Sequence, residues 1–384
     1  MRLGGRNSLI AFFFVSTLAQ TVLITVLPLE AYRVLGGARE VSIAYLAAGV
    51  AAFAGRLAIP FMTRLMRRPG VLALGAGSLV LACGLLTTET PIGLVPGLAL
   101  TQFAFACLEV VLNLYMLDYV ARGEIARFEA RRIFVAAAPF TVGPWLGVYL
   151  QVKVAHWLPF AIAASAAVVL LAAFLGSEVA RSAPARALPP RSANPLRYVP
   201  HFFAQPRLRL AWVMAAGRSS WWAMFQIYAP IFAVKSGLGA EVGGVMVSIG
   251  LGWIWMVPLW GWVGRRFGIR RLFIAGYSTA GLITLAAALA MGTPMLGATI
   301  LLLAAFAHES LDGGGNTPFL RAVHPYERNE MTTVFISYRD VSQLAPPGIF
   351  ALLLAAFDLP AVFLAGGVMS LVLAGLSRYL PRRF

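Results

Sequence analysis

The chain has few charged residues and little cysteine for its length. Of its 384 residues, 12% are charged and 60% are hydrophobic, and the mean hydropathy is +0.79. Soluble domains have roughly 25% charged and 45–50% apolar residues. The composition therefore excludes an ordinary soluble domain and indicates a polytopic membrane protein.

The two cysteines, Cys83 and Cys107, lie in apolar segments, and the sequence has neither a CxxC pair nor a cluster of cysteine and histidine. This excludes a disulfide framework and the common zinc motifs. The sequence also lacks HExxH, a nucleophile elbow and a phosphate-binding loop. We therefore expect no enzyme activity, no cofactor and no bound metal.

The apolar runs are continuous and about 20 residues long, which is the length of a membrane-spanning helix. Backbone groups in lipid are satisfied only in helices or closed barrels, and barrel strands alternate apolar and polar residues. The sequence thus predicts an all-α membrane protein. We place its spans at residues 8–29, 41–62, 71–88, 95–119, 132–152, 157–176, 209–234, 241–263, 272–291, 295–320, 332–357 and 360–380.

Acidic residues are scarce: 15 stand against 31 basic ones, for a formal net charge of +16. Most basic residues lie in one alternate set of connections between spans, whereas Arg33, Arg39, Lys153 and Lys235 lie in the other. This asymmetry is the positive-inside bias that sets orientation, and it explains the charge through topology and anionic lipid, without a nucleic-acid partner. We expect a multi-pass protein of the cytoplasmic (inner) membrane with both termini in the cytoplasm.

One long connection, rich in proline and arginine, divides the spans six and six. It predicts an N-terminal bundle over residues 1–176, a cytoplasmic linker over residues 177–208 and a C-terminal bundle over residues 209–384.

The two halves also show an internal repeat. The displacement that carries Glu109 onto Asp312 also carries Pro144 onto Pro347. Internal duplication is a common plan of secondary transporters, which bind their substrate near the midplane between the repeats.

The segment GWVGRRFGIRRLF at residues 261–273 resembles the loop between the second and third helices of each half in the major facilitator superfamily (MFS). That pattern is roughly G-x-x-x-D-R-x-G-R-R. Allowing a one-residue slip for the last two, the matching residues are Gly261, Arg266, Gly268, Arg270 and Arg271. Arg265 occupies the usual acidic position, and the first-half counterpart at residues 60–70 loses both the acid and the motif's glycines. In the family this acid helps to latch a neighbouring helix on the cytoplasmic side, so here the latch is missing or built differently.

A second segment, GPWLG, resembles the end of the superfamily's antiporter motif, G-P-x-x-G, through Gly143, Pro144 and Gly147. The earlier glycines of that motif are replaced by alanine at residues 136–138. Glycine and proline also bend a membrane helix and permit close helix approach. The segment indicates either an exporter or a structural kink.

The resemblance implies two six-helix transmembrane bundles related by pseudo-two-fold symmetry, which work by alternating access. It also implies a central cavity lined by helices one, four, seven and ten of the chain.

Spans four and ten carry polar stripes that the repeat makes equivalent. Their members, at helical spacing, are Gln102, Glu109 and Asn113 in span four and Glu309, Asp312, Gly313 and Asn316 in span ten. A charge at the bilayer centre costs roughly 2.5–3.5 kcal/mol on insertion scales. We therefore expect both stripes to face a water-filled path, with the glycines allowing close approach of a helix or a substrate.

Glu109 and Asp312 are the candidate proton sites. Low dielectric disfavours the charged form of a carboxyl group, so such a group can load and unload protons. A fixed polar contact is the alternative for each. His308, four residues before Asp312, either extends the relay or is a satisfied packing histidine.

In span seven, Arg218 shares a helical face with Trp222 and Gln226. It can pair with Asp312 or Glu309, or clamp a substrate anion through two hydrogen bonds. A permanent structural ion pair and a side chain that snorkels toward the cytoplasm are the alternatives.

Gln20 in span one is a further cavity candidate, although such residues more often bond a neighbouring helix. Arg339 and Asp340, a few turns into span eleven, predict a local ion pair at the cytoplasmic gate. The glycines, proline and arginines of the two motifs belong to the same gating group.

These observations favour a secondary transporter of a small organic solute. It is expected to be proton-coupled and monomeric, with the antiporter-like segment favouring efflux by proton antiport. Proton-symport uptake of a small organic anion held by Arg218 is the alternative within this class. A non-transporting membrane receptor or partner protein is the alternative of a different class.

Overall fold

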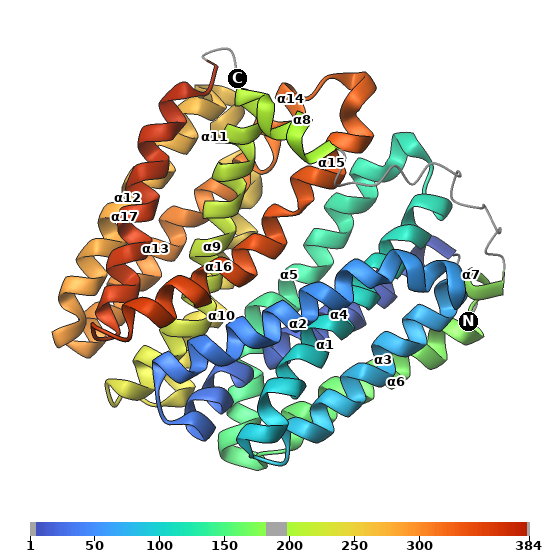
Figure 1. Cartoon of the computed structure of the whole chain (residues 1–384), viewed down its shortest axis with the longest axis horizontal. Coiled ribbons are helices and arrows are strands. Elements are labelled where there is room, and N and C mark those ends of the chain that lie inside the picture. Colours follow the sequence, from blue (N-terminus) through green and yellow to red (C-terminus); the bar gives the residue numbers. More distant parts are fainter. Residues whose placement is uncertain (1–4, 182–197, 382–384) are drawn as a thin grey trace. The chain divides into compact units, whose positions relative to one another are not determined.

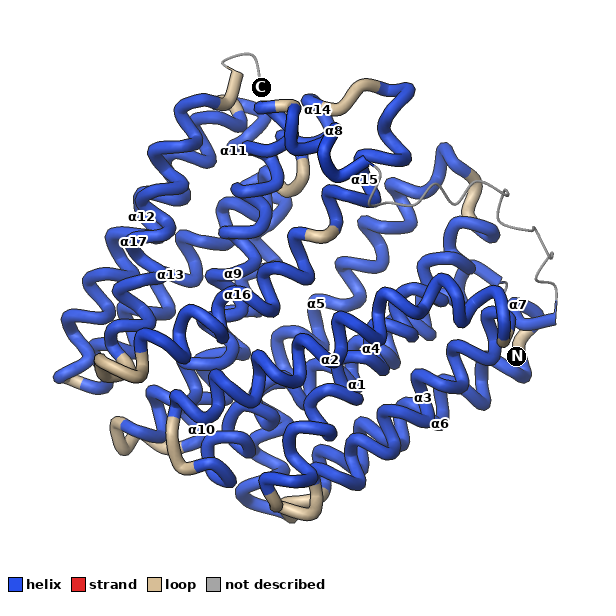
Figure 2. The backbone as a smooth tube through the Cα atoms, viewed as in Figure 1, coloured by secondary structure: helices blue, strands red, loops and turns tan. Residues whose placement is uncertain are grey.

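The computed structural model describes residues 5–181 and 198–381, and the regular elements within these ranges are helical (Figure 1, Figure 2). Residues 182–197 of the predicted linker lie outside the described residues. The chain forms two compact units, one of residues 1–185 with 239–252 and one of residues 186–238 with 253–384. The predicted division at residues 177–208 stays a prediction.

Within the described residues, the first unit contains seven α-helices in its N-terminal part and one later segment. They are α1 (Gly5–Leu35), α2 (Ala38–Leu65), α3 (Arg67–Leu86), α4 (Pro91–Tyr119), α5 (Ile125–Tyr149), α6 (Leu158–Gly176), α7 (Glu178–Arg181) and α10 (Ala240–Gly252). Helix α3 packs on both α4 and α6, α1 packs on α5 and α6, and α10 packs on α5. A short π-helical turn, η2 (Leu150–Val154), extends α5.

Aromatic side chains and glycines hold this unit together. Phe174 of α6 meets Phe12 and Tyr115 edge to face, with ring centroids 5.8 and 5.0 Å apart. A Cβ atom at Gly147 would lie 2.0 Å from the carbonyl oxygen of Val22. Helices α1 and α5 can therefore approach this closely only because position 147 has no side chain.

The second unit is built from the remaining helices. They are α8 (Val199–Ala204), α9 (Pro206–Lys235), α11 (Val257–Phe267), α12 (Ile269–Leu289), α13 (Pro294–Gly314), α14 (Thr317–Ala322), α15 (Arg328–Ile336), α16 (Tyr338–Leu353) and α17 (Pro360–Leu376). Helix α12 packs on α13 and α17, which run beside it in Figure 1, and α9 packs on α16 and α17.

Three predicted spans are interrupted. Span eight changes to a 3-10 turn at Trp253–Met256, span ten ends as a regular helix at Gly314, and span eleven breaks at Ser337 between α15 and α16. At Gly315 the backbone has a φ of +49°, which favours glycine, and Pro318 then begins the next short helix. The hydrophobic runs predicted these spans, but glycine and proline accompany the breaks in spans eight and ten, whereas neither residue lies at the Ser337 break of span eleven.

Ten helical segments of the described residues are long and apolar enough to cross a membrane. The helices of predicted spans seven and eleven fall outside this set. Helix α9 carries Arg218 in its middle, and α16 has only 16 residues.

Candidate functional site

The polar groups of the second unit gather where α9 passes the broken end of α13. Arg218 lies in the middle of α9, and its side chain is only 7% exposed. The Nη1 atom of Arg218 donates to the carbonyl oxygens of Leu311 at 3.3 Å and Gly315 at 2.9 Å. Its Nη2 atom donates to Oδ1 of Asn316 at 3.2 Å. The last carbonyl groups of a helix have no partner within the helix and carry partial negative charge. Arg218 therefore caps the end of α13.

The same guanidinium pairs with Asp312. The Nε atom of Arg218 lies 3.3 Å from Oδ1 of Asp312, and the indole Nε1 of Trp222 donates to Oδ2 at 3.0 Å. The Asp312 side chain keeps 31% of its surface exposed. Of the partners that the sequence allowed for Arg218, the structure selects Asp312.

Glu309 differs from Asp312 although both lie on α13. It is 4% exposed, and no hydrogen bond or ion pair of its carboxyl group is found among the described residues, although neither of its oxygens belongs to the fully buried polar atoms that lack a partner. Burying a carboxylate without a partner is costly, because the lost hydration is not replaced. A proton bound to Glu309 would remove that cost.

His308 of α13 is fully buried where α13 meets α9. Its ring stacks on Trp221 with centroids 4.2 Å apart, and its Nε2 lies 3.1 Å from the carbonyl oxygen of Arg218. Its Nδ1 is buried without a hydrogen-bond partner in the described part of the chain. The packing role and a relay role both remain compatible with this position.

Aromatic residues of the interrupted span eight lie against α13. Phe306 has ring centroids 4.8 Å from Trp253 and 5.5 Å from Trp260. A Cβ atom at Gly313 would lie 2.3 Å from Cβ of Trp260, so the glycine admits the tryptophan. Phe306, Glu309 and Gly313 stand at i, i+3 and i+7 and therefore share one face of α13.

The indole Nε1 atoms of both Trp253 and Trp260 are buried and have no acceptor among the described residues. Buried polar groups in proteins nearly always have a partner, which can be a ligand or a water molecule. Spacing along the sequence could not show that these indole donors are unused.

The other predicted site residues differ in burial within their own units. In the first unit, Gln102 and Asn113 of α4 are partly buried, whereas Glu109 of α4 and Gln20 of α1 are exposed. Gln226 of α9 is partly buried. Their role in a substrate or proton path stays a prediction.

The motif residues occupy helix ends and helix contacts. Gly268 has a φ of +94° and joins α11 to α12, a conformation that favours glycine, while Arg266 and Arg271 flank it and are exposed, with Arg270 partly buried. Gly261 faces the backbone of Gly313, since a Cβ there would lie 3.6 Å from its carbonyl oxygen.

The second motif lies in the contact between α5 and α1. A Cβ atom at Gly143 would lie 2.4 Å from Oγ1 of Thr21, and Pro144 stands one position further on. The structure gives the glycines of this motif a packing role, and the gating role of the motif stays a prediction.

Arg339 of α16 is exposed and Asp340 of α16 is partly buried.

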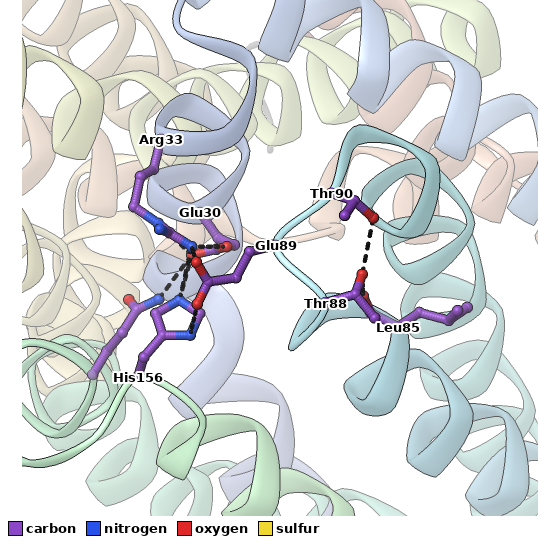
Figure 3. A network of polar contacts seen from close by, with 8 residues as sticks. Glu30, Arg33, Leu85, Thr88, Glu89, Thr90 and His156 are labelled. Carbon is purple, nitrogen blue, oxygen red and sulfur yellow. Dashed lines mark hydrogen bonds and ion pairs between the residues drawn. The ribbon is translucent and has the colours of Figure 1, made fainter.

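Sequence reasoning missed two polar assemblies in the first unit. Arg68 of α3 forms an ion pair with Asp118 of α4 and lies over the ring of Tyr115, 5.6 Å from its centroid. This pair ties the basic loop of the first half to α4 without the motif's acid. The second assembly joins Glu30, Arg33, Glu89 and His156 (Figure 3). Spacing indicates only the Glu30–Arg33 pair on α1, because the other partners come from segments distant in the sequence.

The fold and this cluster define a multi-pass helical membrane protein with buried ionisable groups in its second unit, the class to which secondary transporters belong. The family model described as "Major Facilitator Superfamily" matches residues 9–347, and the chain therefore belongs to this superfamily of transporters. This membership establishes that the chain is a transporter and not an enzyme. No curated protein matches the chain.

Solved transporters share its fold at low sequence identity. The crystal structure of the nucleoside transporter NupG is 13% identical with a TM-score of 0.76, and the match covers 98% of this chain and 99% of that one. A POT family transporter in complex with 5-aminolevulinic acid is 11% identical with a TM-score of 0.75, covering 96% and 94%. The peptide transporter POT in complex with sulfate is 14% identical with a TM-score of 0.72, covering 97% and 93%. These identities show a common fold and leave the solute open.

Proposed function

We propose that this MFS transporter moves a small organic solute by alternating access in exchange for protons, with export as the direction. The observation that carries the proposal is the buried carboxyl group of Glu309, which has no ion pair among the described residues and lies on α13 three residues before Asp312, the partner of Arg218. A carboxyl group in this position can bind a proton in one state and release it when hydration or a partner reaches it in another. The predicted role of Asp312 then becomes that of a partner to Arg218, with Glu309 as the proton carrier.

The arrangement of Arg218 favours exchange over anion uptake. Its guanidinium already donates to two backbone carbonyl groups, to Asn316 and to Asp312. An anionic solute would have to displace partners that also hold the end of α13. The alternative, proton-symport uptake of an organic anion held by Arg218, therefore requires a larger rearrangement of this site.

The aromatic residues support a solute that carries a ring. Trp222, Trp253, Trp260 and Phe306 present apolar faces, and two of the indole groups present unused donors. Small-molecule sites typically combine such apolar walls with a few polar groups that fix orientation. The antiporter-like segment at Gly143 supports export, and the bias of the basic connections supports a cytoplasmic membrane with both termini inside.

The test is solute-driven proton movement in proteoliposomes. A thermal-shift screen of metabolites and drugs first identifies a solute, and a pH-sensitive dye in the lumen then reports proton flux on its addition. We expect Glu309→Gln to abolish this flux while solute exchange in the absence of a pH gradient persists. Glu109→Gln is the matched carboxyl variant in the other unit and tests the second predicted proton site.

Unchanged flux in Glu309→Gln would reject Glu309 as the proton carrier. Proton movement in the same direction as the solute would replace exchange with symport. A solute that binds but is never transported would support the receptor alternative.

A further inference from the structure

A polar cluster in the first unit lies at the end of α1 that is distant from its N-terminus (Figure 3). The side chain of Glu30 is fully buried, and its carboxylate accepts hydrogen bonds from Arg33, with Nη2 2.7 Å from Oε1 and Nε 3.2 Å from Oε2. Nε2 of Gln151 donates to Oε2 at 3.1 Å. These contacts satisfy the charge of a carboxylate that would otherwise be costly to bury.

The imidazole ring of His156 bridges two carboxylates. Its Nε2 lies 2.8 Å from Oε2 of Glu30, and its Nδ1 lies 3.0 Å from Oε1 of Glu89. A neutral imidazole has one N–H donor and one lone pair, so it can bond only one of two carboxylates. The imidazolium form has two donors and bonds both. The geometry thus fits the charged ring.

Arg33 determines which hydrogen bonds a neutral His156 ring could make. Its Nη2 lies 3.2 Å from Nε2 of His156 and 2.9 Å from Oε2 of Glu89. A neutral ring could accept at Nε2 from Arg33 and keep its bond to Glu89, but its lone pair would then face the buried carboxylate of Glu30 at 2.8 Å. Loss of the proton therefore replaces an attraction with a repulsion at the buried end of the cluster.

The connection between α3 and α4 supplies Glu89 in a strained conformation. Its φ is +56°, which is uncommon for a residue other than glycine and persists where the surroundings hold it. In the same turn Oγ1 of Thr88 donates to the carbonyl oxygen of Leu85 at 2.7 Å and lies 3.0 Å from Oγ1 of Thr90. The hydrogen bond from Arg33, and then the charge of His156, lower the pKa of Glu89, so this carboxyl group stays charged near neutral pH.

The other charged groups at this end of the unit do not reach the ring. Lys153 of η2 pairs with Glu241 of α10 at 2.9 Å. Arg39 and Glu40 of α2 are exposed and make no contact with His156 among the described residues. The charge state of the ring is therefore set by Glu30, Arg33 and Glu89.

We propose that His156 is a proton-operated latch that ties the turn at residues 87–90 and the η2–α6 connection to the end of α1. The latch is closed when the ring is an imidazolium and opens when it loses its proton. Histidine is the side chain that most often changes charge near neutral pH, so about pH 6 and pH 8 are the conditions chosen to test the latch. Stability from a protonated histidine is present at acid pH and is lost as the pH rises. With both termini cytoplasmic, as predicted, the latch senses the opposite side of the membrane.

Hydrogen exchange of the full-length protein in nanodiscs tests this latch. After correction for the intrinsic pH dependence of exchange, we expect protection of the amides at 87–90 and 155–158 to fall about tenfold between pH 6 and pH 8, the size of losing one charge-assisted hydrogen bond. His156→Arg, whose charge is fixed, should remain protected at both pH values. His156→Gln should lack the extra protection at both. Glu89→Gln alters an exposed turn, so the variant folds, and it should release residues 87–90 while leaving the Glu30 contacts.

Lys153→Gln is the control, because it breaks an ion pair at the same end without touching the ring. It should keep the pH response of the natural protein. Equal protection of the natural protein at pH 6 and pH 8 would overturn the proposal, and so would a pH response that persists in His156→Arg or in His156→Gln.

Discussion

The Nε atom of Arg218 lies 3.3 Å from Oδ1 of Asp312, while Nη1 of the same guanidinium lies 2.9 Å from the carbonyl oxygen of Gly315. One side chain therefore neutralises an acid and caps the helix that carries it. The ion pair and the break in α13 depend on each other, since α13 ends where Arg218 can replace the missing backbone partners.

Arg218→Ala should destabilise the protein by roughly 3 kcal/mol, because Asp312 loses its ion pair and keeps only the indole donor of Trp222, and the carbonyl oxygen of Gly315 loses its side-chain donor. Arg218→Lys should recover only part of this, since lysine lacks the planar fork. Arg209→Ala, an exposed arginine on the same helix, is the control and should change little. Thermal unfolding in one detergent compares the variants. Equal melting temperatures for the Arg218→Ala and Arg209→Ala proteins would refute the capping role.

Gly147→Ala should destabilise the first unit by about 1–3 kcal/mol, the usual cost of overpacking. The added Cβ would lie 2.0 Å from a backbone oxygen of α1, which cannot move as a side chain can. Gly77→Ala in α3 is the matched control, since a Cβ there meets nothing within 4 Å. It should stabilise α3 by about 0.5–1 kcal/mol. Unfolding temperatures of the two variants that shift in the same direction would contradict this account of the α1–α5 contact.

Trp260→Phe should cost only the packing of the lost ring, because the indole N–H that it removes has no acceptor among the described residues. Under the proposed function it should weaken solute binding. Trp221→Phe is the contrast, since Nε1 of Trp221 donates to Oγ1 of Thr284 at 3.1 Å inside the unit. That variant should lose about 1 kcal/mol for the hydrogen bond in addition to the packing of the lost ring. Unfolding and solute titration together check the pair, and unchanged solute affinity in the Trp260→Phe protein would remove this donor from the site.

The contact of α8 with the turn before α15 should weaken in acid. The hydrogen bond from His201, at 3.1 Å, lowers the pKa of Glu327 below its ordinary value of 4.5, with Gln205 as a second donor. A carboxyl group with a lowered pKa contributes stability that is present above its ordinary value and is lost as the pH falls through the lowered one. Hydrogen exchange of residues 199–204 should therefore accelerate below about pH 4.5.

Glu327→Gln should remove this acid response, because the amide does not titrate in this range. An acid response of the same size in the variant would show that another group controls the contact.

Composition and hydrophobic length predicted a helical membrane protein, and the resemblance in the loop at residues 261–273 predicted the superfamily. Both signals are local and survive in any arrangement of the helices. The breaks at Trp253 and Gly315 were less accessible, because a hydrophobic run reads the same whether or not its backbone is interrupted. The pairing of Arg218 with Asp312 was one of several partners that the spacing allowed.

The sequence by itself determined that the chain spans the membrane as helices and that acids interrupt its tenth span, since both depend only on the residues along the chain. The tertiary structure decided which acid has a partner and which does not. It placed Arg218 at the end of α13, left Glu309 buried alone, and set His156 between Glu30 and Glu89. Which partners these side chains have depends on how each helix is rotated about its axis and on where the neighbouring helix ends. Contacts between residues distant in the sequence fix the rotation and the end point.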